Sequence, residues 1–259
     1  MKYIRFALRV LSIRESRGIF RWLVGFLIYL HSLIMWAKRD QFTSFQDCLF
    51  YSRKQASAPF IGERQIEYPW VYKRVFDLQD RCILDVGAKE GLPITDLLLE
   101  KNTVYAIDPN IPSSLKRGRL TLIKGDVRST SFEEGFFDAV VAVSTLEHIG
   151  VAGRYGTVVG ETDGDFGAMQ EIRRILSPGG RALITVPYGT GRSLPLNRLY
   201  DAKRTKQLFE GFDLVECAYF RYTPQYRLWL EVPEHVASNT NWDVEPRYAL
   251  ACFCAIKTG

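Results

Sequence analysis

The sequence predicts an α/β fold: a doubly wound, mostly parallel sheet with helices on both faces, preceded by an N-terminal helical extension. Short β-branched apolar runs alternate with helix-like segments from Cys82 onward. Each run is mainly apolar and lacks the alternation of polar and apolar residues, as in strands that are covered on both faces. The composition, with 47% hydrophobic and 24% charged residues over 259 positions, is that of a globular protein and excludes disordered and fibrous classes.

The predicted elements follow one another in alternation. We expect strands over 82–86, 103–107, 120–123, 139–143 and 182–186, and helices over about 92–100, 166–176 and 202–210. Parallel strands need long crossovers, and helices supply them. We therefore expect three regions: a basic and apolar segment over 1–40, a helical lead-in over 41–81, and an α/β domain over 82–259.

The first 40 residues differ from the rest in charge. They carry eight Lys or Arg and two acidic residues, which leaves the remainder of this +5 chain at −1. A near-neutral body argues against nucleic-acid binding. The run Trp22–Ala37 has no charged residue, but it is shorter than the roughly 20 residues that span a bilayer. We expect peripheral or re-entrant attachment to a membrane surface. A cap on the protein's own core and a true span are the alternatives.

The cysteines indicate the compartment. Five are present, an odd number, and none forms a CxxC pair, so we expect a reducing compartment and no structural zinc. Cys252 and Cys254 alternate along a strand-like run and should share one face of it. With the basic N-terminal segment, this predicts a cytoplasmic protein at the inner face of the cell membrane.

Two strand ends carry the strongest site signals. The first predicted strand runs into Asp85–Gly91, where Gly87 and Gly91 permit a tight turn that a ligand can approach. The second ends at Asp108, where folds of this kind hold ribose hydroxyls. Either signal alone also fits an ordinary turn or a solvated carboxylate, but together they favour a nucleoside-containing cofactor.

From here the chain resembles the class I S-adenosylmethionine-dependent methyltransferases, over about residues 80–220. The motifs that carry the resemblance are Asp85–Gly91, Asp108, Gly125-Asp126-Val127, Phe137–Ile149, and Glu171–Gly180 followed by 182–187. The resemblance implies a Rossmann-like methyltransferase fold and S-adenosyl-L-methionine as cofactor. It implies cofactor contacts from Asp85, Gly87, Gly91, Asp108, Asp126 and Val127. One position departs from the family: Lys89 stands where a glycine is usual.

Within that family the stretch from Glu147 to Gly156 is less common. It resembles an uncharacterised branch whose genes often lie among those for cell-surface glycans. The resemblance implies O-methylation of a glycan or glycolipid-type acceptor at a membrane surface. A quinone or other lipid-like acceptor is the runner-up.

His148 is the candidate catalytic base, because it follows the fourth predicted strand and histidine titrates near neutral pH. Glu147 would orient the imidazole or stabilise its charged form. The alternative is that both residues have a structural role. Arg154 and Tyr155 lie in a glycine-rich loop and could hold the acceptor. We expect no metal, because Ser144 and Thr145 stand where a further carboxylate would be needed.

Two other classes of protein share part of this pattern. A nicotinamide-dependent oxidoreductase also has a glycine turn and a ribose-binding acid, but Gly87 and Gly91 do not complete a GxGxxG. A catalytically inactive membrane adaptor with a cofactor-binding fold is the second, for which Lys89 is the only hint. The oligomeric state is not indicated by the sequence.

Overall fold

The computed structural model describes residues 19–38, 44–57, 62–88, 93–151, 162–191, 197–226 and 228–258. The strands in these ranges are β1 (Cys82–Val86), β2 (Thr103–Asp108), β3 (Leu115–Arg117), β4 (Leu120–Lys124), β5 (Phe137–Val143), β6 (Leu176–Tyr188), β7 (Phe212–Thr223), β8 (Leu228–Val232) and β9 (Ala249–Lys257). The helices are α2 (Ile19–Lys38), α3 (Phe45–Ser57), α4 (Arg64–Val75), α5 (Pro93–Leu99), the 3-10 helix η1 (Leu146–His148), α6 (Gly164–Ile175), α7 (Ala202–Leu208) and α8 (Glu234–Ser238).

The strands form one nine-stranded mixed sheet in the order β3-β4-β2-β1-β5-β6-β9-β7-β8. The five central strands from β4 to β6 are parallel, and β3, β9, β7 and β8 join by antiparallel pairing. The chain moves outward from β1 first through β2 and β4 and then through β5 and β6. The switch in strand order therefore lies between β1 and β5, as the doubly wound prediction requires.

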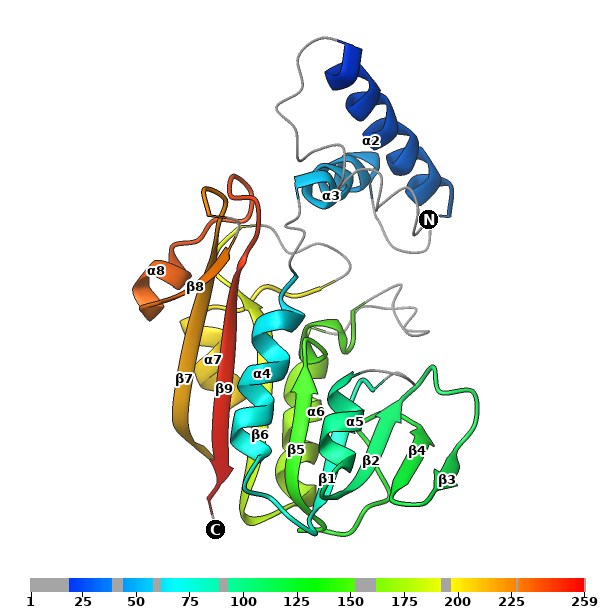
Figure 1. Cartoon of the computed structure of the whole chain (residues 1–259), viewed down its shortest axis with the longest axis vertical. Helices are drawn as coiled ribbons and strands as arrows, with labels where there is room; N and C mark the ends of the chain where they lie inside the picture. The colour runs from blue at the N-terminus through cyan, green and yellow to red at the C-terminus, as the bar shows by residue number, and fades with distance from the viewer. Residues whose placement is uncertain are drawn as a thin grey trace.

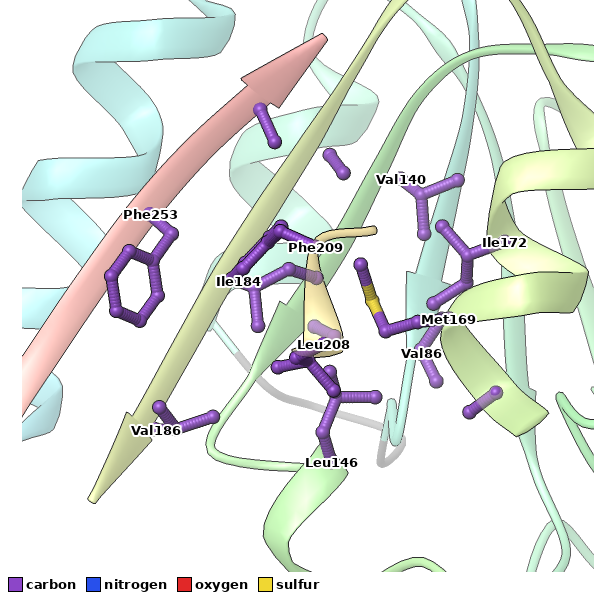
Figure 2. Close-up of a cluster of buried hydrophobic side chains, with 14 of the residues drawn as sticks. Val86, Val140, Leu146, Met169, Ile172, Ile184, Val186, Leu208, Phe209 and Phe253 are labelled. Carbon is purple, nitrogen blue, oxygen red and sulfur yellow. The ribbon is translucent and has the colours of Figure 1, made fainter. Parts of the chain in front are cut away.

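Helices cover both faces of the sheet (Figure 1). On one face Ile83, Val104 and Val141 meet Trp70 and Val71 of α4, together with α5. The adjacent residues of the same strands turn to the other face, which α6 and α7 cover. Figure 2 shows this second layer, with Met169 and Ile172 of α6 beside Val86 and Val140. Because both faces of the central strands are buried, these strands do not need to alternate apolar with polar residues. The predicted fold class is confirmed.

The predicted elements match the structure at the centre of the sheet but not at its antiparallel end. The strands β3, β7 and β8 have no counterpart among the predicted elements, and only the cysteine alternation pointed to β9. Cys252 and Cys254 do share one face of β9, in the layer beneath α4. The Ser-Pro-Gly-Gly stretch of 177–180, which precedes the strand predicted over 182–186, lies within β6. It forms an irregularity there, where Phe137 pairs with Leu176 and Ala139 pairs with Arg181.

The N-terminal helices lie beyond the carboxyl ends of the parallel strands (Figure 1). α3 contacts the body through Lys54 Nζ, which donates to the backbone oxygen of Glu245 (2.5 Å), and through the ring of Phe50 against Trp242. α2 packs on α3. Within the described residues no helix has both the length and the apolarity needed to cross a membrane. The predicted segment 1–40 is described only over 19–38.

Candidate active site

A pocket opens where β1, β2, β4 and β5 end, at the switch in strand order. We call it the switch-point pocket. It is lined by Val86, Gly87, Ile107, Asp108, Pro109, Gly125, Asp126, Val127, Arg128, Thr145, His148, Ile149 and Gly150. Its volume is about 70 Å³, against the roughly 300–1,000 Å³ of typical ligand pockets. A cofactor-sized ligand must therefore extend beyond it. Residues 89–92, after the glycine turn, lie outside the described residues.

Asp108 closes one side of this pocket and is 6% exposed. Its Oδ1 accepts hydrogen bonds from the backbone N–H of Asn110 (2.7 Å) and from Asn110 Nδ2 (2.9 Å). Within the described ranges, no hydrogen bond reaches its Oδ2. One carboxylate oxygen is thus fixed by the turn, while the other can accept from a hydroxyl in the pocket.

Asp126 and Val127 also line the pocket and follow β4, the strand that pairs with β2. Asp126 is paired with Arg128, whose Nη2 lies 2.5 Å from Oδ2 and whose backbone N–H donates to Oδ1 (2.9 Å). Burial alone would raise the pKa of Asp126, but the hydrogen bonds from Arg128 lower it below its ordinary value. Val127 is buried in the core layer and, with Ile107 and Ile149, gives the pocket an apolar wall.

Gly87 lines the switch-point pocket, whereas Asp85 is buried and is not among the residues that line it. Gly87 has a φ of +78°, and a Cβ there would lie 2.4 Å from Oγ1 of Thr145. Its small size is therefore required by the turn and by Thr145 before any ligand is considered. Asp85 is buried behind the turn, does not line the pocket, and accepts a hydrogen bond from Thr95 Oγ1 of α5 (2.7 Å). Burial raises the pKa of Asp85 to about 7.

A second pocket, the outer pocket, shares His148 with the first. It has a volume of about 240 Å³ and lies between α3, α4, the end of β5 and the segment that leads into β9. Its lining residues are Tyr51, Glu63, Arg64, Ser144, Glu147, His148, Asn197, Trp242, Arg247 and Tyr248. Arg64 pairs with Glu67 and Arg247 pairs with Glu63. The lining is therefore polar and aromatic, and its guanidinium groups have acidic partners.

His148 and Glu147 form part of η1 at the junction of the two pockets. Nε2 of His148 lies 3.6 Å from Oε1 of Glu147, and the Glu147 side chain is 4% exposed. That separation exceeds a good hydrogen bond, so in this arrangement Glu147 acts on the imidazole chiefly through its charge. The backbone N–H of Arg198 donates to the backbone oxygen of Glu147 (2.8 Å) and helps to hold η1 in place.

The buried carboxylate of Glu67, on α4, is a site residue that the sequence patterns did not single out. Its Oε1 accepts from Ser144 Oγ (2.5 Å) and Thr185 Oγ1 (2.6 Å), and its Oε2 accepts from Arg64. Ser144 has a φ of +44°, a left-handed conformation that is uncommon outside glycine and is often found at functional sites. The network thus locks the end of β5, from which η1 begins. A signal was available, because Glu67 shares a helix face with Trp70 and Val71.

Asp165, in the first turn of α6, has a structural role, and several predicted site residues lie outside the described ranges. Asp165 is fully buried and accepts from Tyr200 Oη (2.9 Å) and from Arg204 Nη2 (2.6 Å), so it ties α6 to α7. Gly91, Arg154 and Tyr155, with Lys89, are outside the described residues. Among the residues that the structure describes, no three His, Cys, Asp or Glu side chains gather as a metal site.

The sequence comparisons give no function for the chain. A family model described as "Caenorhabditis protein of unknown function, DUF268" matches residues 111–239. No curated protein sequence matches the chain.

Solved structures are more informative. The 1,6-didemethyltoxoflavin-N1-methyltransferase of Burkholderia thailandensis, with bound S-adenosylhomocysteine, has a TM-score of 0.51 at 16% identity, over 76% of this chain and 79% of that one. The phosphoethanolamine N-methyltransferase 2 of Haemonchus contortus, in complex with S-adenosyl-L-methionine, has a TM-score of 0.53 at 19% identity, over 84% and 58%. The [4+2]-cyclase SpnF has a TM-score of 0.52 at 16% identity, over 74% and 79%. At such low identity these likenesses show the fold alone: the chain has the fold of the class I S-adenosylmethionine-dependent methyltransferases.

Proposed function

We propose that this protein is an S-adenosylmethionine-dependent methyltransferase that binds the nucleoside part of its cofactor in the switch-point pocket and the methyl acceptor in the outer pocket. The observation that carries the proposal is that the two pockets meet at His148. A transferred group must pass between neighbouring sites held in fixed geometry. The fold places the junction of these pockets at the carboxyl ends of the central strands, where α/β folds bind ligands.

The described residues fit the nucleoside part of the cofactor. The open Oδ2 of Asp108 can accept from ribose hydroxyls, and the apolar wall formed with Val127 suits a flat adenine ring. Asp126 lies on the same wall, although its pairing with Arg128 makes it a weaker candidate for adenine recognition. The bound cofactor supplies an electrophilic methyl group on a sulfonium. The part of the chain that would hold its methionine end includes Gly91, outside the described residues.

The lining of the outer pocket favours a polar acceptor such as a glycan hydroxyl. Tyr51, Trp242 and Tyr248 offer aromatic surface, while Asn197 and Ser144 offer hydrogen bonds. The buried indole N–H of Trp242 has no hydrogen-bond partner among the described residues, and an acceptor rich in oxygen atoms would supply one. At about 240 Å³ the pocket has room for one ring-sized group.

His148 is the residue that we assign as general base toward such a hydroxyl. It lines both pockets, and histidine is suited to take a proton at neutral pH. The buried carboxylate of Glu147, 3.6 Å from Nε2, would stabilise the imidazolium formed when the acceptor is deprotonated. The buried carboxylate of Glu67, which accepts from Ser144, would keep the junction rigid without itself contacting the acceptor.

A quinone or other lipid-like acceptor is the second candidate, and an inactive adaptor the third. The isoprenoid tail of a quinone would find no aliphatic side chain among the described residues that line the outer pocket, which are polar or aromatic. The fold alone does not separate an enzyme from an adaptor, since it also serves the [4+2]-cyclase.

The test is methyl transfer from S-adenosylmethionine with an isotopically labelled methyl group. The full chain is incubated with separate glycolipid and quinone fractions of a membrane extract, and each fraction is analysed by mass spectrometry. We expect label in the glycolipid fraction, lost in His148→Ala and retained in His235→Ala, which changes an exposed histidine of α8. Label in the quinone fraction alone would show that the acceptor is a quinone and not a glycolipid. Absence of transfer by a chain that binds S-adenosylhomocysteine would support the adaptor instead.

A further inference from the structure

The outward face of α2 is apolar where a water-exposed helix face is normally polar. Leu23, Phe26, Leu30 and Leu33, which we call the α2 stripe, are each between 36% and 49% exposed. Their spacing of three, four and three residues places them on one side of the helix, at roughly 100° per residue. The helix of a globular protein usually turns such a stripe toward the core.

The opposite side of α2 is already occupied by α3. His31, Ser32 and Met35 are buried there, and Nδ1 of His31 lies 2.6 Å from Oγ of Ser52. The His31 ring also stacks on Tyr51, with ring centroids 6.4 Å apart. These polar contacts fix the rotation of α2, so the α2 stripe cannot turn inward without breaking them.

The charges near α2 indicate what would cover the stripe. Arg14, Arg17 and Arg21 precede or begin the helix, Lys38 and Arg39 follow or end it, and no acidic residue lies between Glu15 and Asp40. Basic residues that flank exposed apolar side chains complement a surface of anionic lipid headgroups.

We propose that the α2 stripe docks on an anionic lipid bilayer, with α2 lying in the plane of the interface. α3 would then connect the bilayer to the outer pocket, because Ser52 contacts α2 while the adjacent Tyr51 lines the pocket. Docking would hold the pocket close to the lipid surface, where a membrane-anchored acceptor presents its headgroup. Docking on the bilayer does not depend on the proposed function. Only the inference that a methyl acceptor enters the outer pocket rests on that function.

Vesicle co-flotation of the full chain tests this inference. Vesicles of phosphatidylcholine with phosphatidylglycerol are compared with vesicles of phosphatidylcholine alone. We expect binding to the anionic vesicles, weaker binding to the neutral ones, and loss of binding as salt is raised. The variant Phe26→Ser/Leu30→Ser should bind the anionic vesicles at least tenfold more weakly, because two half-exposed apolar side chains no longer enter the interface.

The matched control is Leu214→Ser/Val215→Ser on β7, where both side chains are similarly exposed (40% and 55%) but far from α2 in sequence. It should bind vesicles like the wild type. Equal loss in both variants, or no binding by the wild type, overturns the inference. Dimerisation that the α2 variant abolishes, without vesicle binding, would show that a second copy covers the stripe and would also overturn it. Binding of S-adenosylhomocysteine, measured on the same preparations, reports separately on the proposed function.

Discussion

Replacing Glu67 by glutamine should destabilise the protein although the side chain keeps its shape. The carboxylate is fully buried, and its oxygens accept from Ser144, Thr185 and Arg64. A glutamine can turn its oxygen toward the two hydroxyls, but its amide nitrogen then faces Arg64, another donor. The variant therefore converts two charge-assisted hydrogen bonds into neutral ones and removes one ion pair.

The magnitude follows from these contacts. Hydrogen bonds to charged groups contribute about 1.5–3 kcal/mol and neutral ones about 1 kcal/mol, so each hydroxyl bond loses roughly 0.5–2 kcal/mol. The Arg64 side chain is 46% exposed, so its pairing adds at most about 1 kcal/mol. The expected total is about 1–5 kcal/mol, or a fall in Tm of roughly 2–20 °C for a chain of this size.

Urea denaturation followed by circular dichroism measures this loss. The control is Glu216→Gln, which removes another carboxylate partner of α4, that of Arg74, but at a side chain that is 46% exposed. It should cost less than about 1 kcal/mol. If Glu67→Gln costs no more than Glu216→Gln, the buried network does not lock the end of β5.

Three further predictions concern the strand ends. Asp108→Ala should raise the dissociation constant for S-adenosylhomocysteine at least tenfold, since hydrogen bonds of about 1.5–3 kcal/mol to a charged acceptor are lost; calorimetry showing unchanged affinity in a folded variant would remove Asp108 from the site. The folded pKa of Asp85 lies above its unfolded value, so the folded state binds the extra proton and stability should fall as pH rises from about 4 to about 7, by up to about 4 kcal/mol. Asp85→Asn should flatten that dependence in urea titrations, and an unchanged slope would contradict the buried placement. His148→Ala should retain cofactor affinity and lose roughly 10²–10⁴-fold in turnover, with partial recovery at high pH and a smaller loss in Glu147→Gln; a loss of affinity or Tm with turnover intact would make His148 structural.

The centre of the sheet could be predicted because its signal is local. Most of the parallel strands are buried on both faces and are therefore mainly apolar runs in the sequence. β3 is three exposed residues, and the first half of β7 exposes Leu214 and Val215, so neither carries such a run. β7 and β8 are partly exposed, whereas β9 is buried over most of its length, and the pairing of all three depends on partners elsewhere in the chain.

The residues of the candidate site also differ in whether their signal is local in the sequence. Asp108 could be placed because it ends a buried strand, and α/β folds bind ligands at the carboxyl ends of their strands. The position of Glu67 on the buried face of α4 was a signal, but its partners could not be identified, because Ser144 and Thr185 lie 77 and 118 residues further along. Asp165 shows the opposite case: a carboxylate near the site in sequence is used to hold α6 and α7 together.

The central claim is that the switch-point pocket binds the nucleoside of S-adenosylmethionine, and calorimetric titration of the full chain with S-adenosylhomocysteine and, separately, with NAD tests it most directly. We expect saturable binding of S-adenosylhomocysteine, no binding of NAD, and weaker binding of S-adenosylhomocysteine by Asp108→Ala. Binding of NAD in place of S-adenosylhomocysteine, or binding of neither by a folded chain, would contradict the claim.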